Sequence, residues 1–383
     1  MKNFRKCLGG MLVFLCLLGS CSIGAKGLEE STLQEEEDIE EKTKDPNKKN
    51  PNKKDDSEDE KKKDDSKEDE TGDSEDTSEE NPLPAAFINS KTLPENEIVF
   101  KFSDPVSFVS LSFDSASDLG YNVIEEEGSE IKIKLTGNPD PGLLVKADLQ
   151  VTDEHDNIII KQVTFRTKNN RVPDLQINEL RTEYSKPKVE FIEFKIHKSG
   201  NMGALRVFVV GNNQNPLVYE FEPVEVGKGD YVALHLRNPE ESCRDEYGAN
   251  LNESGGTDSS PTARDFWVPG LNKLLHKTDA IYVLDQDNKV LDAVMIAENP
   301  SSAWDNADLA EAAEFLFKKG AWKSSGGTIC SPANAVDSSK INTAITRSIS
   351  RDETVANTNT AADWYITANS GATPGQTNNP RRL

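Results

Sequence analysis

The side chains that could carry out catalysis are spread along this 383-residue chain without a recognised catalytic spacing. Its four histidines stand singly, without the partners of a zinc site or of an activated nucleophile: His155, His197, His235 and His276. Ser254 is followed by two glycines and is therefore a candidate nucleophile. Ordinary glycine–serine loops are far commoner than strained catalytic turns, so a loop is the preferred interpretation. Glu193 and Asp292 could form the carboxylate pair of a glycosidase, but the sequence gives no distance between them. We therefore predict no catalytic residue, no metal site and no cofactor, and keep a hydrolase as the alternative.

Cys21 is the one cysteine whose surroundings indicate a specific modification. It follows a basic start, an apolar run over residues 8–18 and the small pair Gly19-Ser20. The run is shorter than the roughly 20 apolar residues that a membrane-spanning helix needs. Residues 1–21 resemble the signal peptide of a bacterial lipoprotein, which implies that Cys21 carries acyl chains such as palmitate and anchors the mature chain. An ordinary secretory signal cleaved near Ala25 or Gly27 is the alternative.

Residues 22–83 have the composition of a disordered linker. They contain 11 lysines against 24 aspartates and glutamates, and no aromatic residue. Such a segment cannot bury enough apolar surface to offset its chain entropy, and its charges repel one another. We predict a solvated tether of roughly 45 Å that holds the rest of the chain away from a bacterial membrane, outside the cytoplasm. The sequence leaves open which membrane this is, and whether the chain faces the periplasm or the cell surface.

The charge of the chain argues against one class of partner. The formal net charge is −23 at pH 7, and acidic surfaces repel polyanions rather than collect them. Nucleic acid is therefore not an expected partner. The expected partners are the lipid bilayer, contacted through acylated Cys21, and an envelope protein or glycan.

Residues 84–171 predict a domain of about seven short strands. Apolar residues alternate over 97–102 and 130–135, which is the pattern of half-buried strands. Ser103-Asp104-Pro105 predicts a turn, and residues 153–157 predict a hairpin loop. Strands at this spacing favour a β-sandwich, and the segment resembles the immunoglobulin-like domains of bacterial surface proteins.

Two acidic turns, residues 153–157 and 285–288, are candidate calcium sites because their side chains carry several oxygen atoms. Neither turn supplies the ligand count of an EF-hand loop. Asp and Asn also favour tight turns for backbone reasons alone, so turns without a metal are the preferred interpretation.

Residues 172–383 contain six short motifs in a fixed order. They are Ile177-Asn178-Glu179, Glu190-Phe191-Ile192-Glu193, Asp292-Ala293-Val294, Ser348-Ile349-Ser350-Arg351, Ala362-Asp363-Trp364 and Thr373-Pro374-Gly375-Gln376-Thr377-Asn378. The series resembles the lamin tail domain over roughly residues 174–379, which implies an immunoglobulin-like β-sandwich with an adhesive or accessory role. The apolar alternation slips between Phe191 and Ile192, which predicts a β-bulge there. The predicted fold class is therefore all-β, with two tandem immunoglobulin-like sandwiches after the tether.

Two segments exceed what the lamin tail resemblance covers, residues 238–277 and 297–340. The first is expected to be a long exposed loop. The second contains one predicted helix, because apolar residues recur with helical spacing after a capping Asp305 or Asn306. The members of this stripe are Leu309, Ala312, Ala313 and Leu316. Trp304 and Trp322 bracket the helix, and such residues usually pack in a core but could form a platform for a carbohydrate.

Cys243 and Cys330 are the remaining cysteines of the predicted mature chain, one in each insert. A disulfide between them would stabilise the fold by about 2–4 kcal/mol in an oxidising compartment. The sequence leaves bonded and free thiols equally open, because it gives no Cα distance. The chain as a whole is expected to be a membrane-anchored, non-catalytic binding or scaffold lipoprotein, with an envelope hydrolase that uses the inserts as the alternative.

Overall fold

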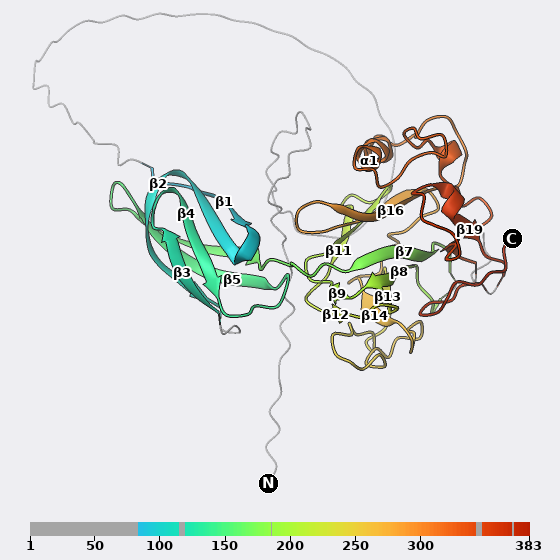
Figure 1. Cartoon of the computed structure of the whole chain (residues 1–383), viewed down its shortest axis with the longest axis horizontal. Coiled ribbons are helices and arrows are strands. Elements are labelled where there is room, and N and C mark those ends of the chain that lie inside the picture. The colour runs from blue at the N-terminus through green and yellow to red at the C-terminus, as the bar shows by residue number, and fades with distance from the viewer. Residues whose placement is uncertain (1–82, 115–118, 185, 342–346, 370) are drawn as a thin grey trace, which may run out of the picture. The chain divides into compact units, whose positions relative to one another are not determined.

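The computed structural model describes residues 83–114, 119–184, 186–341, 347–369 and 371–383. The predicted signal, Cys21 and all but the last residue of the predicted tether lie outside these residues. The described part is built mainly from strands, with a single α-helix and three short 3₁₀ turns, so the all-β prediction is confirmed. The strands β1 to β6 enclose one buried hydrophobic cluster, and later elements enclose a second (Figure 1).

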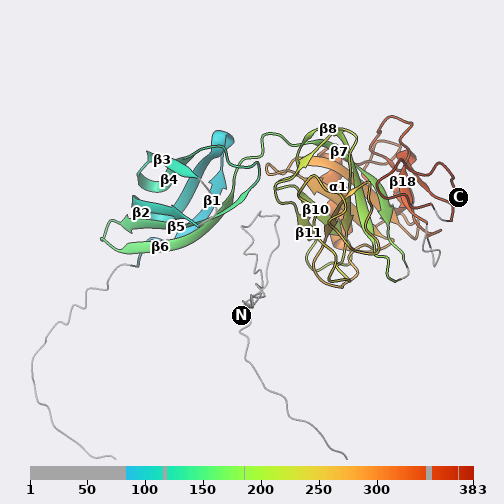
Figure 2. The ribbon, with the colours of Figure 1, turned by 90° about the horizontal axis from the view of Figure 1, so that it is seen from below.

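The first six strands form one antiparallel sheet. Their bounds are β1 (Phe87–Thr92), β2 (Glu97–Phe113), β3 (Gly120–Glu125), β4 (Glu127–Thr136), β5 (Leu144–Asp153) and β6 (Ile158–Arg166), with the 3₁₀ turn η1 (Pro94–Asn96) before β2. The order in the sheet is β3-β4-β2-β5-β6, and β1 pairs with the first part of β2. Figure 2 shows β2, β5 and β6 side by side. The predicted alternation over 130–135 is confirmed, because Ile131, Ile133 and Leu135 are buried.

β2 is one long strand where two strands and a turn were predicted. The predicted turn, residues 103–105, lies inside β2 at a register shift in its pairing with β4. Pro105 has no N–H to donate to a ladder, and a bulge tolerates that loss. The strand pairs with β1 before the shift and with β5 after it. Two predicted strands are thus merged, which leaves six strands rather than about seven in the described residues up to 171.

The hairpin loop predicted over residues 153–157 is confirmed between β5 and β6. The carboxylate of Asp153 accepts hydrogen bonds from the backbone N–H groups of His155 and Asn157, both at 2.9 Å. The side-chain amide of Asn157 donates a further bond, and these bonds lower the pKa of Asp153 to about 2. The carboxylate of Asp153 therefore has a role in closing the turn.

Two sheets share the second hydrophobic cluster and form a β-sandwich. One sheet has the order β14-β13-β8-β7-β18-β19, with β7 (Asp174–Arg181), β8 (Phe191–Lys198), β13 (Tyr231–His235), β14 (Arg264–Trp267), β18 (Ile349–Arg351) and β19 (Trp364–Ile366). The other has the order β11-β10-β15-β16-β17, with β10 (Arg206–Val210), β11 (Leu217–Glu220), β15 (Asp279–Leu284), β16 (Val290–Ala297) and β17 (Val336–Asp337). The short strands β9 (Gly200–Asn201) and β12 (Glu225–Val226) pair with each other, and the 3₁₀ turns are η2 (Pro332–Asn334) and η3 (Ala361–Asp363).

Two bulges interrupt the pairing of β7 with β8, and neither lies between Phe191 and Ile192. One is in β8, where Asp174 pairs with Lys198 and Leu175 with Ile196, so that His197 is the extra residue. The other is in β7. The pairing of β7 with β8 shifts between Ile177 and Glu179, which leaves Asn178 as the extra residue. The prediction of a bulge between Phe191 and Ile192 was therefore wrong. Both residues are fully buried, because β8 is covered on both faces and such a strand does not alternate between apolar and polar residues.

α1 (Ala307–Lys318) confirms the predicted helix. Asn306 caps it, since its side-chain oxygen accepts a hydrogen bond from the N–H of Asp308 at 2.7 Å. The predicted apolar stripe is buried. The helix packs on β10, β15 and β16 (Figure 1), and its Phe315 contacts Tyr282, whose side chain alternates with the core residues Ile281 and Val283. The helix therefore covers the outer face of the five-stranded sheet.

None of the helices found in the described ranges has the length and apolar character needed to cross a bilayer.

Candidate functional site

The acidic side chains of the sequence motifs converge on strand β7, and Glu179 is the first of them. Its buried carboxylate accepts hydrogen bonds from the hydroxyl groups of Ser348 (2.5 Å) and Ser350 (3.2 Å) on one oxygen. The other oxygen accepts the backbone N–H of Thr373 at 2.9 Å. Glu179 therefore connects β7 to β18 and to the last motif, although nearly 200 residues separate it from Thr373.

Glu193 is the cross-strand neighbour of Glu179 on β8 and is equally buried. Its two oxygens accept hydrogen bonds from the side-chain amide of Asn178 (2.9 Å) and from the backbone N–H of Gly375 (2.5 Å). Gly375 has a φ of +77°, and a Cβ atom there would lie 2.5 Å from the hydroxyl oxygen of Ser260. The glycine of the last motif is thus required both by its backbone conformation and by its close approach to residues 260–263 of the first insert.

The two neighbouring carboxyl groups have raised pKa values. Burial raises the pKa of Glu179, and the hydrogen bonds from Ser348 and Thr373 oppose that rise. The pKa of Glu193 lies well above its ordinary range because of burial first and the nearby charge of Glu179 second. Two buried carboxyl groups side by side disfavour a second negative charge, which agrees with the upward direction of both pKa shifts.

Asp292 and Arg351 form a buried ion pair between the two sheets. The carboxylate of Asp292 on β16 accepts hydrogen bonds from the guanidinium of Arg351 (2.6 Å) and from the backbone N–H of Ile177 (2.7 Å). Arg351 also donates to the carbonyl of Ile177 at 2.7 Å, and its guanidinium lies 4.6 Å from the ring centre of Trp364. Burial raises the pKa of Asp292 to about 6, although the charge of Arg351 acts in the opposite direction. Asp292, which interrupts an apolar strand in the sequence, therefore joins the sheets.

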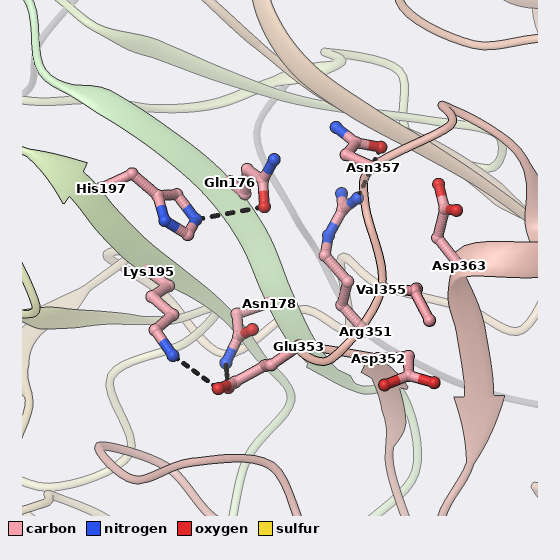
Figure 3. A pocket seen from close by; sticks show the side chains of 10 residues that line it. All are labelled: Gln176, Asn178, Lys195, His197, Arg351, Asp352, Glu353, Val355, Asn357 and Asp363. Carbon is pink, nitrogen blue, oxygen red and sulfur yellow. Dashed lines mark hydrogen bonds and ion pairs between the residues drawn. The ribbon is translucent and has the colours of Figure 1, made fainter.

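A polar cavity of about 250 Å³ lies beside this network (Figure 3). It is lined by side chains from β7, β8 and the segment from Arg351 to Asp363. They are Gln176, Asn178, Lys195, His197, Arg351, Asp352, Glu353, Val355, Asn357 and Asp363. Figure 3 shows Lys195 and Asn178 both directed at Glu353, and His197 directed at Gln176. This cavity is the candidate functional site.

The residues predicted as alternative catalysts do not assemble into a reactive group. The hydroxyl of Ser254 is buried and accepts a hydrogen bond from the indole N–H of Trp267 at 3.0 Å. His235 is fully buried, pairs with Asp265 (Nε2 to Oδ1, 2.9 Å) and stacks on Trp267. In the ranges that the structure describes, no hydrogen bond joins Ser254 to a histidine or Glu193 to Asp292.

The first insert, residues 238–277, is only partly the exposed loop that was predicted: many of its residues are exposed and without regular secondary structure, but others are buried. It contributes strand β14, which pairs in parallel with β13. Its Asp258 forms a buried ion pair with Arg181 of β7, and its Cys243 and Trp267 pack together with Val189. Five polar residues of the insert, Glu246, Ser254, Asp258, Ser260 and Asp265, are buried and bonded within the chain, which composition alone does not reveal.

The sequence left open a disulfide between the two cysteines and a sugar platform on the two tryptophans, and the structure has neither. Cys243 and Cys330 are free, buried thiols that belong to two different hydrophobic clusters. Trp322 is only 1% exposed, so its ring has no face for a sugar. Trp304 is partly buried against the same core and donates its N–H to the carbonyl of Cys330 at 2.9 Å. Both tryptophans are therefore packing residues.

The fold and the site define a class: an all-β sandwich in which the motif carboxylates bind the chain's own backbone and hydroxyl groups. Residues 173–366 match the family model TP_1001_2nd, described as "protein second domain", and the chain, slightly more than half of which is matched, belongs to that family. The chain is also similar to an "Uncharacterized protein" of Treponema pallidum (strain Nichols), with 26% identity over 248 residues. The match covers 60% of this chain and 61% of the relative, so the chain spans about three fifths of that relative's length.

The sequence did not predict the cavity, but three of the residues that line it belong to the sequence motifs. Asn178, Arg351 and Asp363 stand in three of the six motifs. These three motifs considered together could have indicated the site, because all three residues lie in strands or turns of the same sheet. Gln176 and Asn357 carry no signal in the sequence that separates them from other surface amides.

Proposed function

We propose that this chain is a non-catalytic lipoprotein of a bacterial cell envelope, anchored through acylated Cys21 and binding a partner with its β-rich part. The anchor is supported by the basic start, apolar run and small residues before Cys21. The acidic composition of residues 22–83 supports a tether between lipid and partner site. The proposal includes an immunoglobulin-like domain at 84–171 and a lamin tail-like domain at 172–383.

The non-catalytic part rests on one observation, namely that the motif carboxylates are occupied by internal hydrogen-bond donors. Glu179, Glu193 and Asp292 each accept at least two such bonds and are at most 4% exposed. A general acid, base or nucleophile must instead reach the reacting atom of a substrate. These residues are in positions that stabilise the sandwich, and the cavity beside them offers polar groups suited to binding.

A substrate panel tests this proposal. The full chain is incubated with chromogenic esters, glycosides and phosphate esters, beside the variants Glu193→Gln and Ser254→Ala. We expect release of chromophore at the rate of the protein-free control in all three samples. Turnover by the unchanged chain that is lost in either variant, while that variant keeps its cooperative unfolding transition, would establish an enzyme and contradict the proposal.

A further inference from the structure

We propose that the polar cavity beside β7 and β8 binds an uncharged sugar ring. The inference deepens the proposed function, on which it rests, by naming the ligand class of the binding module. The observations that carry it are the pairing of the charges in the cavity wall, the unused neutral groups between them, and the size of the cavity.

The charged groups of the wall are already paired within the chain. Lys195 binds Glu353 at 2.5 Å, and Arg351 binds Asp292 at 2.6 Å. Asp352 is paired with Arg382. Asp363 accepts hydrogen bonds from the backbone N–H groups and a hydroxyl of residues 358 and 360. An ionic ligand would have to compete with these internal partners. Among the acidic and basic side chains named here, Asp363 alone is bonded by neutral donors only.

The groups of the wall that keep unused hydrogen-bonding capacity are mostly neutral. The side-chain oxygen of Gln176 accepts a hydrogen bond from Nε2 of His197, and the amide N–H groups of Gln176 have no partner in the described ranges. The oxygen of Asn357 accepts from Arg351, while its N–H groups are likewise unused within those ranges. Asn178 is 1% exposed and uses both amide hydrogens on Glu193 and Glu353, which leaves its oxygen as an acceptor directed at the cavity.

A hydroxyl group can both donate and accept a hydrogen bond. A ring that carries several hydroxyl groups therefore matches the neutral donors and acceptors of the cavity wall. The donors come from two separate segments of the cavity wall, Gln176 on β7 and Asn357 on the segment after β18 (Figure 3). Val355, which is 51% exposed, supplies an apolar surface for the carbon face of a ring. The volume of about 250 Å³ lies below the roughly 300–1,000 Å³ of sites for drug-sized ligands, which suits one ring rather than an extended chain.

The test is a ligand-observed NMR titration of the full chain in detergent with methyl glycosides. The panel contains the methyl glycosides of glucose, galactose, mannose and N-acetylglucosamine. We expect saturation transfer to at least one of them, with a dissociation constant raised about threefold to tenfold by Gln176→Ala and by Asn357→Ala, since each removes about one hydrogen bond. Gln214→Ala is the matched control, because Gln214 is an exposed amide outside the cavity and should leave binding unchanged.

Methyl glucuronide and inorganic phosphate are added separately as competitors of the bound glycoside. Three outcomes would overturn the inference: no transfer to any glycoside, transfer that the two cavity variants leave unaltered, or displacement of the glycoside by either anion at a lower concentration than by any neutral glycoside. Thermal unfolding of each variant shows that loss of binding is not loss of fold. The same spectra separate this inference from the proposed function. Release of methanol from a bound glycoside would contradict the non-catalytic proposal but would agree with a sugar site in the cavity. Absence of both binding and cleavage would contradict the sugar site and leave the non-catalytic proposal standing.

Discussion

Replacing Asp292 by alanine should destabilise the second sandwich strongly, because it leaves Arg351 buried without its counter-charge. The side chains of Arg351 and Asp292 are 4% and 3% exposed. Removing one partner of a buried, hydrogen-bonded pair costs about 3–5 kcal/mol. The backbone N–H of Ile177 loses its acceptor in the same variant, which places the expected loss in the upper part of that range.

Tryptophan fluorescence during urea unfolding measures this loss in the second sandwich alone. All four tryptophans lie between residues 267 and 364, so the signal does not report the first six strands. The matched control is Glu314→Ala, which breaks the exposed pair of Glu314 with Lys318 on α1 and should change the free energy of unfolding by less than about 0.5 kcal/mol. The two variants should keep the urea dependence of the unchanged chain, since that dependence scales with the surface exposed on unfolding.

A double variant completes the test of the ion pair. Asp292→Ala combined with Arg351→Met removes both charges, so we expect it to be less destabilised than the sum of the two single variants. The reasoning is refuted if Asp292→Ala loses no more free energy of unfolding than the Glu314→Ala control. It is also refuted if the effects of the two single variants are additive.

Three further outcomes are expected. The pKa of Asp292 is raised to about 6 from 3.8 in the folded state, so the free energy of unfolding should fall by about 2 kcal/mol as pH rises from 4 to 7. The isosteric Asp292→Asn, which cannot titrate, should lose this component in urea titrations at several pH values. Gly375→Ala should lower the unfolding midpoint more than Gly327→Ala. Both glycines have φ near +77°, but only at Gly375 would the added Cβ atom lie within 2.7 Å of atoms of Ser260 and Ala263. Equal losses in the two variants would show that this close approach is unimportant. A thiol reagent should react with Cys243 and Cys330 of the unreduced protein only after denaturation, since both thiols are buried and free. If the two cysteines remain unreactive in urea, they form a disulfide bond instead.

The local elements were predictable where one short stretch of residues determines them. The helix after Asn306 follows from its cap and its apolar stripe, and both are present in α1. The alternation of residues 130–135 and the hairpin loop at 153–157 were predicted for the same reason. The motifs also indicated which residues matter, because Glu179, Glu193 and Arg351 all belong to the buried network.

The arrangement of the site was not predictable, because it depends on contacts between residues far apart in the chain. The bond from Thr373 to Glu179 and that from Gly375 to Glu193 each span more than 180 residues. The position of the bulge at Asn178 depends on the pairing with β8, and no pattern within β7 marks it. Trp322 could not be distinguished from an exposed aromatic residue, since its burial depends on the packing of the second insert.

Metabolic labelling with an alkyne analogue of palmitate tests the central claim, that the chain is a lipid-anchored envelope protein. The full chain and a Cys21→Ala variant are expressed in a bacterium that processes lipoproteins, and label is measured on the purified proteins with the signal-processed mass recorded beside it. The account predicts label on the unchanged chain, cleavage before Cys21, and neither of these in the variant. An unlabelled mature chain that begins near Ala25 or Gly27, or label that persists in Cys21→Ala, would contradict it.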